Sequence, residues 1–227
     1  MNKIAIFTSF LIIFGITLNA EDYQYQYFTK EKDKYVPFSD YIPKSRLHYQ
    51  TVPHYLEDYY QLYGMKQYYN ENSLRKNIHR LKIALDSKFR HPSMALVKVE
   101  SEKEYLKYRN LMFMHINLLI MRNYLKIGAR YDKKKIYFFN MDFAKEIRES
   151  LDIAEKNYRE AIPYWEEAKK YAAQASNIKI TTELSFMESE RYSIIHGELD
   201  FSKIINTYLK NLAKKKNRLD TGTNDNS

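Results

Sequence analysis

The sequence contains no cysteine and only five glycines among its 227 residues. Without cysteine the chain can form no disulfide, and it offers no thiol as a catalytic nucleophile or as the attachment point of a lipoprotein's lipid. Five glycines leave little material for the glycine-rich loops that bind phosphate groups. A chain of this length can still bury roughly 70% of its unfolded surface, so we expect a fold that relies on side-chain packing.

Catalytic and metal-binding patterns are also missing. No Gly-x-Ser-x-Gly motif occurs, and the adjacent carboxylates of Glu166 and Glu167 point about 100° apart on a helix. The histidines occur singly, without the i,i+4 pairing of a metal-binding helix; they are His48, His54, His79, His91, His115 and His196. We therefore expect no enzyme, cofactor or metal site, and we interpret His115 as a hydrogen-bonded core residue because its neighbours are apolar.

The first twenty residues have the pattern of a secretory signal peptide. Lys3 precedes an apolar run over residues 4–18, and the small Ala20 stands before the acidic Glu21. Such a run is short for a membrane span, which favours export with cleavage after Ala20. We predict a mature chain without a transmembrane span; the alternative is that the segment is retained as an N-terminal anchor.

The charge balance is basic. Loss of residues 1–20 removes one cation and no anion, which lowers the formal net charge from +9 to +8. For an exported protein this surplus favours phospholipid head groups, cell-wall polymers or acidic proteins as partners, and not nucleic acid. The dense lysine runs, at 133–135 and 214–216, are interpreted as a loop and as a solvated helix end, respectively. Abundant Lys, Ile, Asn and Tyr are typical of an AT-rich genome and point to a bacterium with a periplasm.

Residues 21–70 are predicted to form a Tyr- and Pro-rich irregular arm with a short helix after about His54. Twelve of the 22 tyrosines lie between positions 23 and 69, and prolines at 37, 43 and 53 interrupt any long helix. The tyrosine rings either bury against a helical body or become ordered on a partner. Tyr23, Tyr25 and Tyr27 alternate with period two and are candidate partner-binding residues.

Residues 71–217 show the three- and four-residue spacing of apolar side chains that is typical of amphipathic helices. Together with the short turns between them, these segments predict an all-α fold, an antiparallel helical array or bundle. We expect the final residues, 218–227, to be a disordered tail.

Several helix boundaries can be predicted from capping residues. The expected starts are Asn72 or Ser73, Ser101 with Glu104 in a capping box, about Asn140, Thr181 or Thr182, and Asp200. The expected ends are before Pro92, at Gly128, at a break or kink caused by Pro163, and at Gly197. The helix that ends at Gly128 is apolar on most faces, so it should be the longest and most buried.

Trp165 is the only tryptophan, and it shares a helical face with Ala168, Ala172 and Ala175. Small residues on one face allow another helix to approach closely. We expect Trp165 to be buried in this contact; the alternative is an exposed anchor for a partner protein.

Residues 157–168 resemble the second half of a tetratricopeptide (TPR) repeat, with Tyr, Ala, Ile, aromatic and Ala residues in that order. They depart from the repeat at Pro163, and no glycine turn precedes them. The resemblance implies TPR-like helix packing. With the signal peptide and composition, the chain also resembles exported, TPR-containing periplasmic proteins of the spirochaete flagellar motor collar.

This resemblance implies a non-enzymatic periplasmic scaffold that contacts other envelope proteins and supports flagellar assembly and motility. The alternative function is a basic module that binds an anionic cell-wall or lipid surface. The two hypotheses differ in the expected salt dependence of partner binding.

Overall fold

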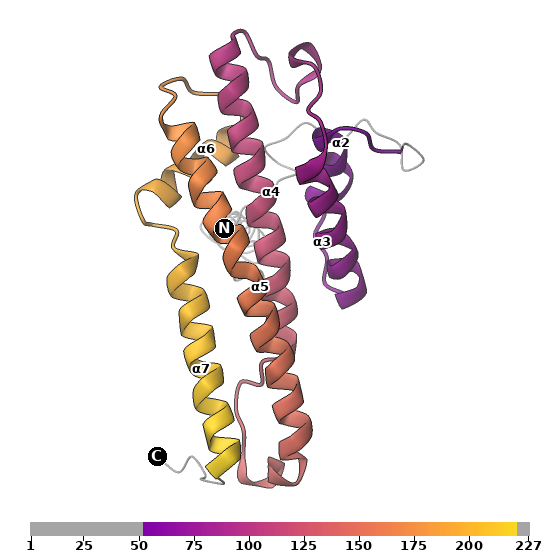
Figure 1. Cartoon of the computed structure of the whole chain (residues 1–227), viewed down its shortest axis with the longest axis vertical. Helices are drawn as coiled ribbons and strands as arrows, with labels where there is room; N and C mark the ends of the chain where they lie inside the picture. Colours follow the sequence, from indigo (N-terminus) through magenta and orange to yellow (C-terminus); the bar gives the residue numbers. More distant parts are fainter. Residues whose placement is uncertain (1–51, 222–227) are drawn as a thin grey trace, which may run out of the picture. The chain divides into compact units, whose positions relative to one another are not determined.

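The structure, a computed structural model, describes residues 52–221 (Figure 1). Apart from one isolated bridge between Tyr55 and Lys88, the regular structure of these residues is helical. The predicted all-α fold class is therefore confirmed. The signal peptide and the candidate residues Tyr23, Tyr25 and Tyr27 lie outside the described residues.

Helices of very different length follow one another along the chain. In order they are α2 (Leu56–Tyr59), the π-helical turn η2 (Tyr60–Gly64), α3 (Glu71–Asp86), the 3₁₀ turn η3 (Pro92–Met94), α4 (Glu102–Tyr131), the 3₁₀ turn η4 (Phe138–Phe143), α5 (Ala144–Ser176), α6 (Ser185–Ile195) and α7 (Phe201–Thr221). Among the helices of residues 52–221, none has the length and hydropathy needed to cross a membrane.

Helices α4 and α5 form an antiparallel hairpin, which contains the most extensive helix contact. Tyr124 stacks on Tyr164 with ring centroids 5.8 Å apart, and Phe113 stacks on Tyr171 at 5.0 Å. Positions descend along α4 as they ascend along α5, which is the register of an antiparallel pair.

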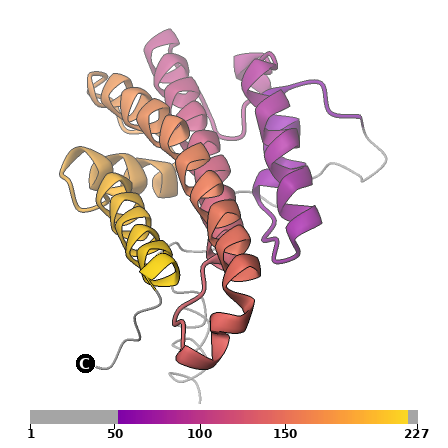
Figure 2. The same cartoon turned by 60° about the horizontal axis from the view of Figure 1, so that its bottom comes forward.

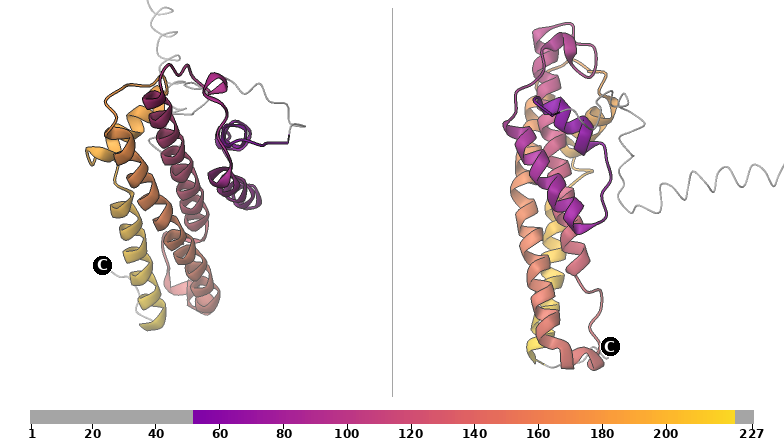
Figure 3. Two further views of the ribbon diagram at one scale, coloured as in Figure 1. Left: turned by 45° about the horizontal axis from the view of Figure 1, so that its top comes forward. Right: turned by 90° about the vertical axis from the view of Figure 1, so that its right-hand side faces the viewer.

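Helix α7 packs antiparallel against the other side of α5. The rings of Trp165 and Phe201 meet edge-on, with centroids 5.4 Å apart. Closer to the start of α5, the ring centroids of Tyr158 and Tyr208 lie 5.0 Å apart. Helices α3, α4, α5 and α7 thus lie side by side, and the shorter α6 crosses near the start of α7 (Figure 2, Figure 3).

Helix α4 is the most buried helix of the described residues, as predicted, with 17 of its 30 residues buried against 9 of 33 in α5. Its contacts extend to α3, α5 and α6, and Leu118 in its middle is fully buried. Helix α3 is tied to it by the Lys82 Nζ to Tyr124 Oη contact of 3.0 Å. The prediction that it is the longest helix was wrong, because α5 has 33 residues and α4 has 30.

The predicted end of α4 at Gly128 was also wrong. The helix continues to Tyr131, and the only glycine with a left-handed backbone in the described residues is Gly197, with φ 73°. A Cβ atom at Gly128 would lie 2.4 Å from Cε1 of Tyr158. Gly128 therefore allows α5 to approach α4 closely and does not terminate the helix.

Pro163 does not interrupt α5, which is helical from Ala144 to Ser176. Proline leaves the carbonyl four residues earlier, that of Arg159, without its helical donor. Both residues are exposed, so water can satisfy this carbonyl. The TPR-like segment lies inside this uninterrupted helix, and TPR-like packing is not confirmed.

Other predicted caps shift by a few residues. Asn70, not Asn72 or Ser73, caps α3, and α3 ends at Asp86, well before Pro92. Helix α5 begins at Ala144, because the expected start near Asn140 falls in the 3₁₀ turn η4.

Side-chain oxygens cap α4 and α7 as expected, but not α6. Ser101 Oγ accepts from the Glu104 amide at 3.2 Å, and Asp200 Oδ1 accepts from the Ser202 amide at 3.0 Å. Helix α6 begins at Ser185, beyond the expected Thr181 or Thr182, and Leu184 at its cap position has no side-chain oxygen that could cap it.

The C-terminal residues depart most from expectation. Helix α7 includes residues 218–221, which were assigned to the tail, and Leu219 is buried. In the lysine run 214–216, Lys215 pairs with Asp132 at 2.5 Å and Lys216 with Glu155 at 2.5 Å. These two lysines are not solvated; they join α7 to the α4–α5 hairpin.

Candidate functional site

A cluster of charged side chains is buried between α4 and α6. Glu190 of α6 accepts from Arg122 Nη2 at 2.5 Å and contacts His115 Nδ1 at 2.5 Å. The side chains of these three residues are 5%, 7% and 0% exposed, in the order Glu190, Arg122, His115. We call them the Glu190 cluster. The expectation that His115 is a hydrogen-bonded core residue is confirmed.

Burial and pairing oppose each other in this cluster. Burial alone would raise the pKa of Glu190, but the charge of Arg122 and the hydrogen bonds of Arg122 and His115 bring it below its usual value. Burial lowers the pKa of His115 more than the contact with Glu190 raises it. Near pH 7 the cluster therefore consists of a carboxylate, a guanidinium and a neutral imidazole.

Aromatic rings surround the cluster. Tyr60 and Phe186 meet the His115 ring edge-on, with centroids at 5.6 and 5.7 Å. Burial, with the charge of Glu190, raises the pKa of Tyr60 well above its usual value, so this phenol stays neutral. An ion pair in such apolar surroundings strongly constrains the position of α6, because separating its members would leave charges buried.

A second ionic contact holds the start of α6. Glu188 lies 2.9 Å from Lys107 Nζ of α4 and accepts from Arg191 Nε at 2.8 Å. It also accepts from the Thr182 amide at 3.0 Å. Helix α6 has 11 residues, and both of its buried carboxylates are paired with α4. These contacts make α6 a rigidly placed element.

The outer face of α6 carries exposed apolar side chains. Tyr192 is 49% exposed and Ile195 is 43% exposed, and the neighbouring ring of His196 stacks on Tyr192 with centroids 3.8 Å apart. We call these three residues the α6 patch. Their i, i+3 and i+4 positions place them on one side of the helix.

A second exposed aromatic group lies in residues 132–143, which connect α4 to α5 and which we call the tip. Tyr137, Phe139 and Phe143 are 49%, 58% and 59% exposed. The lysines at 133–135 precede them and are also exposed. The tip thus combines large apolar side chains with a positive charge.

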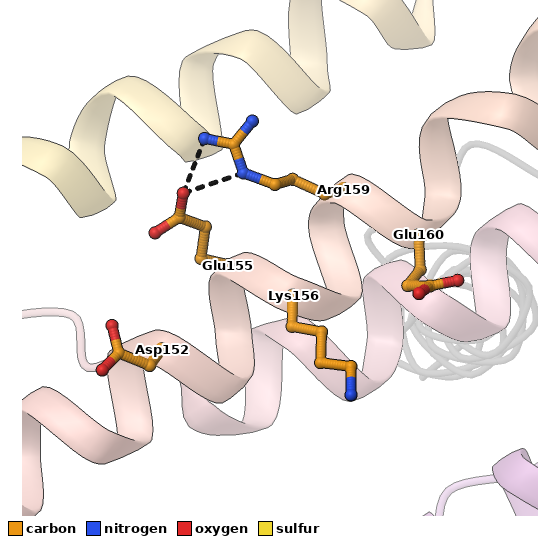
Figure 4. Close-up of a pocket in the computed structure, with 5 residues that line it drawn as sticks. All are labelled: Asp152, Glu155, Lys156, Arg159 and Glu160. Carbon is orange, nitrogen blue, oxygen red and sulfur yellow. Dashed lines mark hydrogen bonds and ion pairs between the residues drawn. The ribbon is translucent and has the colours of Figure 1, made fainter.

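A shallow groove of about 390 Å³ runs along α5 and is lined by Asp152, Glu155, Lys156, Arg159 and Glu160 (Figure 4). Glu155 accepts from Arg159 Nε at 2.8 Å and also binds Lys216 of α7. Lys216 and then Arg159 lower the pKa of Glu155. Lys216 of α7 also pairs with Asp152, so two carboxylates of the groove hold α7 against α5.

The candidate residue Trp165 is buried, with 2% exposure, as the flanking alanines predicted. Its indole donates to Ser202 Oγ at 2.7 Å, and Ala168, Ala172 and Ala175 are buried on the same face. Its contacts in the structure are thus with this chain. A partner-binding role for Trp165 stays a prediction, and its burial does not favour that role.

The sequence did not reveal Glu190 as a partner of His115 and Arg122. His115 and Arg122 lie 75 and 68 positions before Glu190 in the sequence, and nothing in the sequence of α6 distinguishes it from other short amphipathic helices. A carboxylate at Glu190 on the inward face of α6 was the one available signal. Within residues 52–221, no group of three or more His, Cys, Asp or Glu side chains is arranged to hold a metal ion.

Comparison with known proteins identifies a family. No curated protein and no solved structure matches the chain. Residues 103–221 match a family described as "Domain of unknown function (DUF8513)". The match includes nearly all of α4 and extends to the end of α7, so it contains the Glu190 cluster, the α6 patch and the tip. Because it covers more than half of the sequence, the chain belongs to the DUF8513 family.

Proposed function

We propose that this protein is a non-enzymatic scaffold that binds other proteins of the bacterial envelope. The observation that carries the proposal is the α6 patch, in which exposed Tyr192 and Ile195 stand on a helix fixed by two buried ionic contacts. An aromatic anchor on a rigid element loses little conformational entropy when it binds. Such a surface suits a stable protein partner.

The periplasm is the proposed location. It is supported by the signal-peptide pattern of residues 1–20 and by the Lys-, Ile-, Asn- and Tyr-rich composition. The likeness to spirochaete collar proteins supports a role in flagellar motor assembly and motility. Mass spectrometry of the native protein tests the location first: an N-terminus at Glu21 supports export with cleavage, and an intact peptide across Ala20 supports a retained anchor.

Recovery of partners from envelope fractions tests the scaffold proposal. We expect the full chain to recover defined proteins even above about 0.3 M salt, where exposed charge contacts are screened over a few ångströms. The double variant Tyr192→Ser, Ile195→Ser should lose them. The matched control is Met94→Ser, Leu106→Ser, which alters residues of 61% and 50% exposure elsewhere. Equal recovery by both double variants would refute the role of the α6 patch.

A second candidate function is binding to an anionic envelope surface. The observation that favours it is the exposed lysine run at 133–135 beside the aromatic side chains of the tip. Recovery that collapses above about 0.3 M salt, without defined protein partners, would support this function over the scaffold.

A further inference from the structure

We propose that the tip, residues 132–143, docks the protein onto a membrane leaflet that contains anionic phospholipid. The inference rests on the second candidate function and names its ligand; it does not depend on the α6 patch. Three properties of the tip carry it: exposed aromatic area, a fixed local conformation and a surplus of positive charge.

The aromatic area is large for so short a segment. Tyr137, Phe139 and Phe143 each expose about half of their surface or more. The rings of Tyr137 and Phe139 stack with centroids 5.2 Å apart and planes 5° from parallel. They form one continuous stacked pair. Tyr is enriched at membrane interfaces, where its amphipathic ring lies at the level of the head groups and its hydroxyl meets water.

Hydrogen bonds within the tip hold these rings in position. The Tyr137 amide donates to Asn140 Oδ1 at 3.0 Å, and the Asn140 amide donates to the Tyr137 carbonyl at 2.9 Å. The reciprocal pair starts the 3₁₀ turn η4, on which Phe139 and Phe143 lie. The aromatic surface therefore exists before binding, and binding need not order it.

The charge of the tip complements an anionic leaflet. Lys133, Lys134 and Lys135 are exposed, and within residues 52–221 none of them is in an ion pair. Of the two acidic residues in the tip, Asp132 is paired with Lys215, which leaves Asp142 as the exposed one. Lysine side chains can lay their methylene stems along apolar surface while their ammonium groups reach phosphate.

The position of the tip also fits a flat ligand. It joins the paired ends of α4 and α5, and the C-terminal end of α7 lies beside it through the Lys215 to Asp132 contact (Figure 1). A leaflet can be reached by the end of a hairpin without any groove. An acidic protein is the competing occupant, and the experiment distinguishes it.

Vesicle sedimentation with the full chain tests the proposal. The probes are vesicles of phosphatidylcholine with 30% phosphatidylglycerol, at about 0.05 M salt, and vesicles of phosphatidylcholine alone. A retained signal peptide would insert into both kinds, so only the difference between them reports on the tip. Each lysine near an anionic surface contributes about 1 kcal/mol, or roughly fivefold. The variant K133Q/K134Q/K135Q should therefore bind anionic vesicles about a hundredfold more weakly.

Two controls make the result specific. K76Q/K88Q/K103Q removes the same charge from exposed lysines outside the tip and should bind like the wild type within a few-fold. F139S/F143S should weaken binding while leaving melting unchanged, since both rings are exposed. In the Phe139→Trp variant, brominated lipid should quench the new fluorescence and spare the buried Trp165.

The outcomes separate this inference from the function on which it rests. If wild type and K133Q/K134Q/K135Q bind anionic vesicles equally, another surface binds lipid and the tip proposal fails alone. If wild type does not prefer anionic vesicles, the tip proposal fails; binding to isolated cell-wall polymer would still support the second candidate function. Recovery of one acidic protein by wild type, but not by the tip variant, would assign the tip to a protein and overturn the proposal.

Discussion

Removing the charge of Glu190 should loosen the α6 end of the molecule more than any change on its surface. In Glu190→Gln the side chain keeps its size and one oxygen, but the carboxylate that faces Arg122 and His115 is lost. The guanidinium of Arg122 is 7% exposed, so water compensates it poorly. Breaking a buried ion pair on one side typically costs about 3–5 kcal/mol.

The effect can be measured as a melting temperature. For a domain of 150–250 residues, 1 kcal/mol corresponds to about 2–4 °C, so Glu190→Gln should melt about 6–20 °C below the wild type. The double variant Glu190→Leu, Arg122→Met replaces the pair with apolar groups of similar size. It should recover most of the loss, because no charge is then buried without its partner.

Two results would refute this reasoning. An unchanged melting temperature for Glu190→Gln would mean that the cluster contributes little to stability. A double variant less stable than Glu190→Gln would mean that Arg122 is stabilised mainly by contacts other than the carboxylate, such as the Phe201 ring 6.0 Å from its guanidinium carbon.

Four further predictions follow from the packing. Trp165→Ala should cost about 3–5 kcal/mol, because a cavity would replace the buried indole. Gly128→Ala should cost about 1–3 kcal/mol, because its Cβ would overlap the Tyr158 ring. Leu118→Asp should cost about 4 kcal/mol or more by burying a carboxylate without a partner. His115 has a lowered folded pKa, so below its unfolded value near 6.5 the unfolded chain binds the extra proton, and stability should fall on acidification by up to about 1.4 kcal/mol per pH unit.

Each of these predictions has a control in the same chain. Trp165→Phe should cost less than Trp165→Ala, and Tyr158→Leu should make Gly128→Ala nearly harmless. Leu106 of α4 is 50% exposed, so Leu106→Asp should change the free energy of unfolding by no more than about 0.5 kcal/mol. His115→Gln should flatten the pH profile between pH 5 and 7, and the exposed His79→Gln should not. Thermal melts monitored by circular dichroism measure all four, and equal effects of a variant and its control would count against the corresponding packing argument.

The sequence predicted the helical class and the most buried helix because both depend on local spacing of apolar residues. Leu118 lies in a run so apolar that only burial on most sides explains it. The alanine face around Trp165 likewise predicted a close helix contact, now seen with the start of α7. Periodicity reports which face of a helix is buried, and here it did so correctly.

The helix ends predicted at Gly128 and Pro163 were wrong because the effect of glycine and proline on a helix depends on tertiary contacts. Glycine often ends a helix, but Gly128 lies inside α4, where its missing side chain leaves room for the ring of Tyr158, 30 residues further along the chain. Pro163 is tolerated because it lies on the exposed face of α5. Local propensity is a weak guide when packing decides otherwise.

Charge pairing over long separations could not be predicted at all. The sequence shows Lys215 and Lys216 as part of a basic run, and only the fold brings them to Asp132 and Glu155. The Glu190 cluster is the same case. Pairing of this kind depends on how helices far apart in the chain are placed, about which the spacing of residues carries no information.

The central claim, that this protein is a scaffold for envelope proteins, can be tested most directly by photo-crosslinking in cells that make it naturally. A photoreactive phenylalanine analogue would replace Tyr192 of the α6 patch and, separately, Leu106 of α4, which has similar exposure. We predict that the analogue at Tyr192 forms covalent adducts with one or a few defined envelope proteins, and that the analogue at Leu106 does not. Adducts at neither position, or the same adducts at both, would contradict the claim.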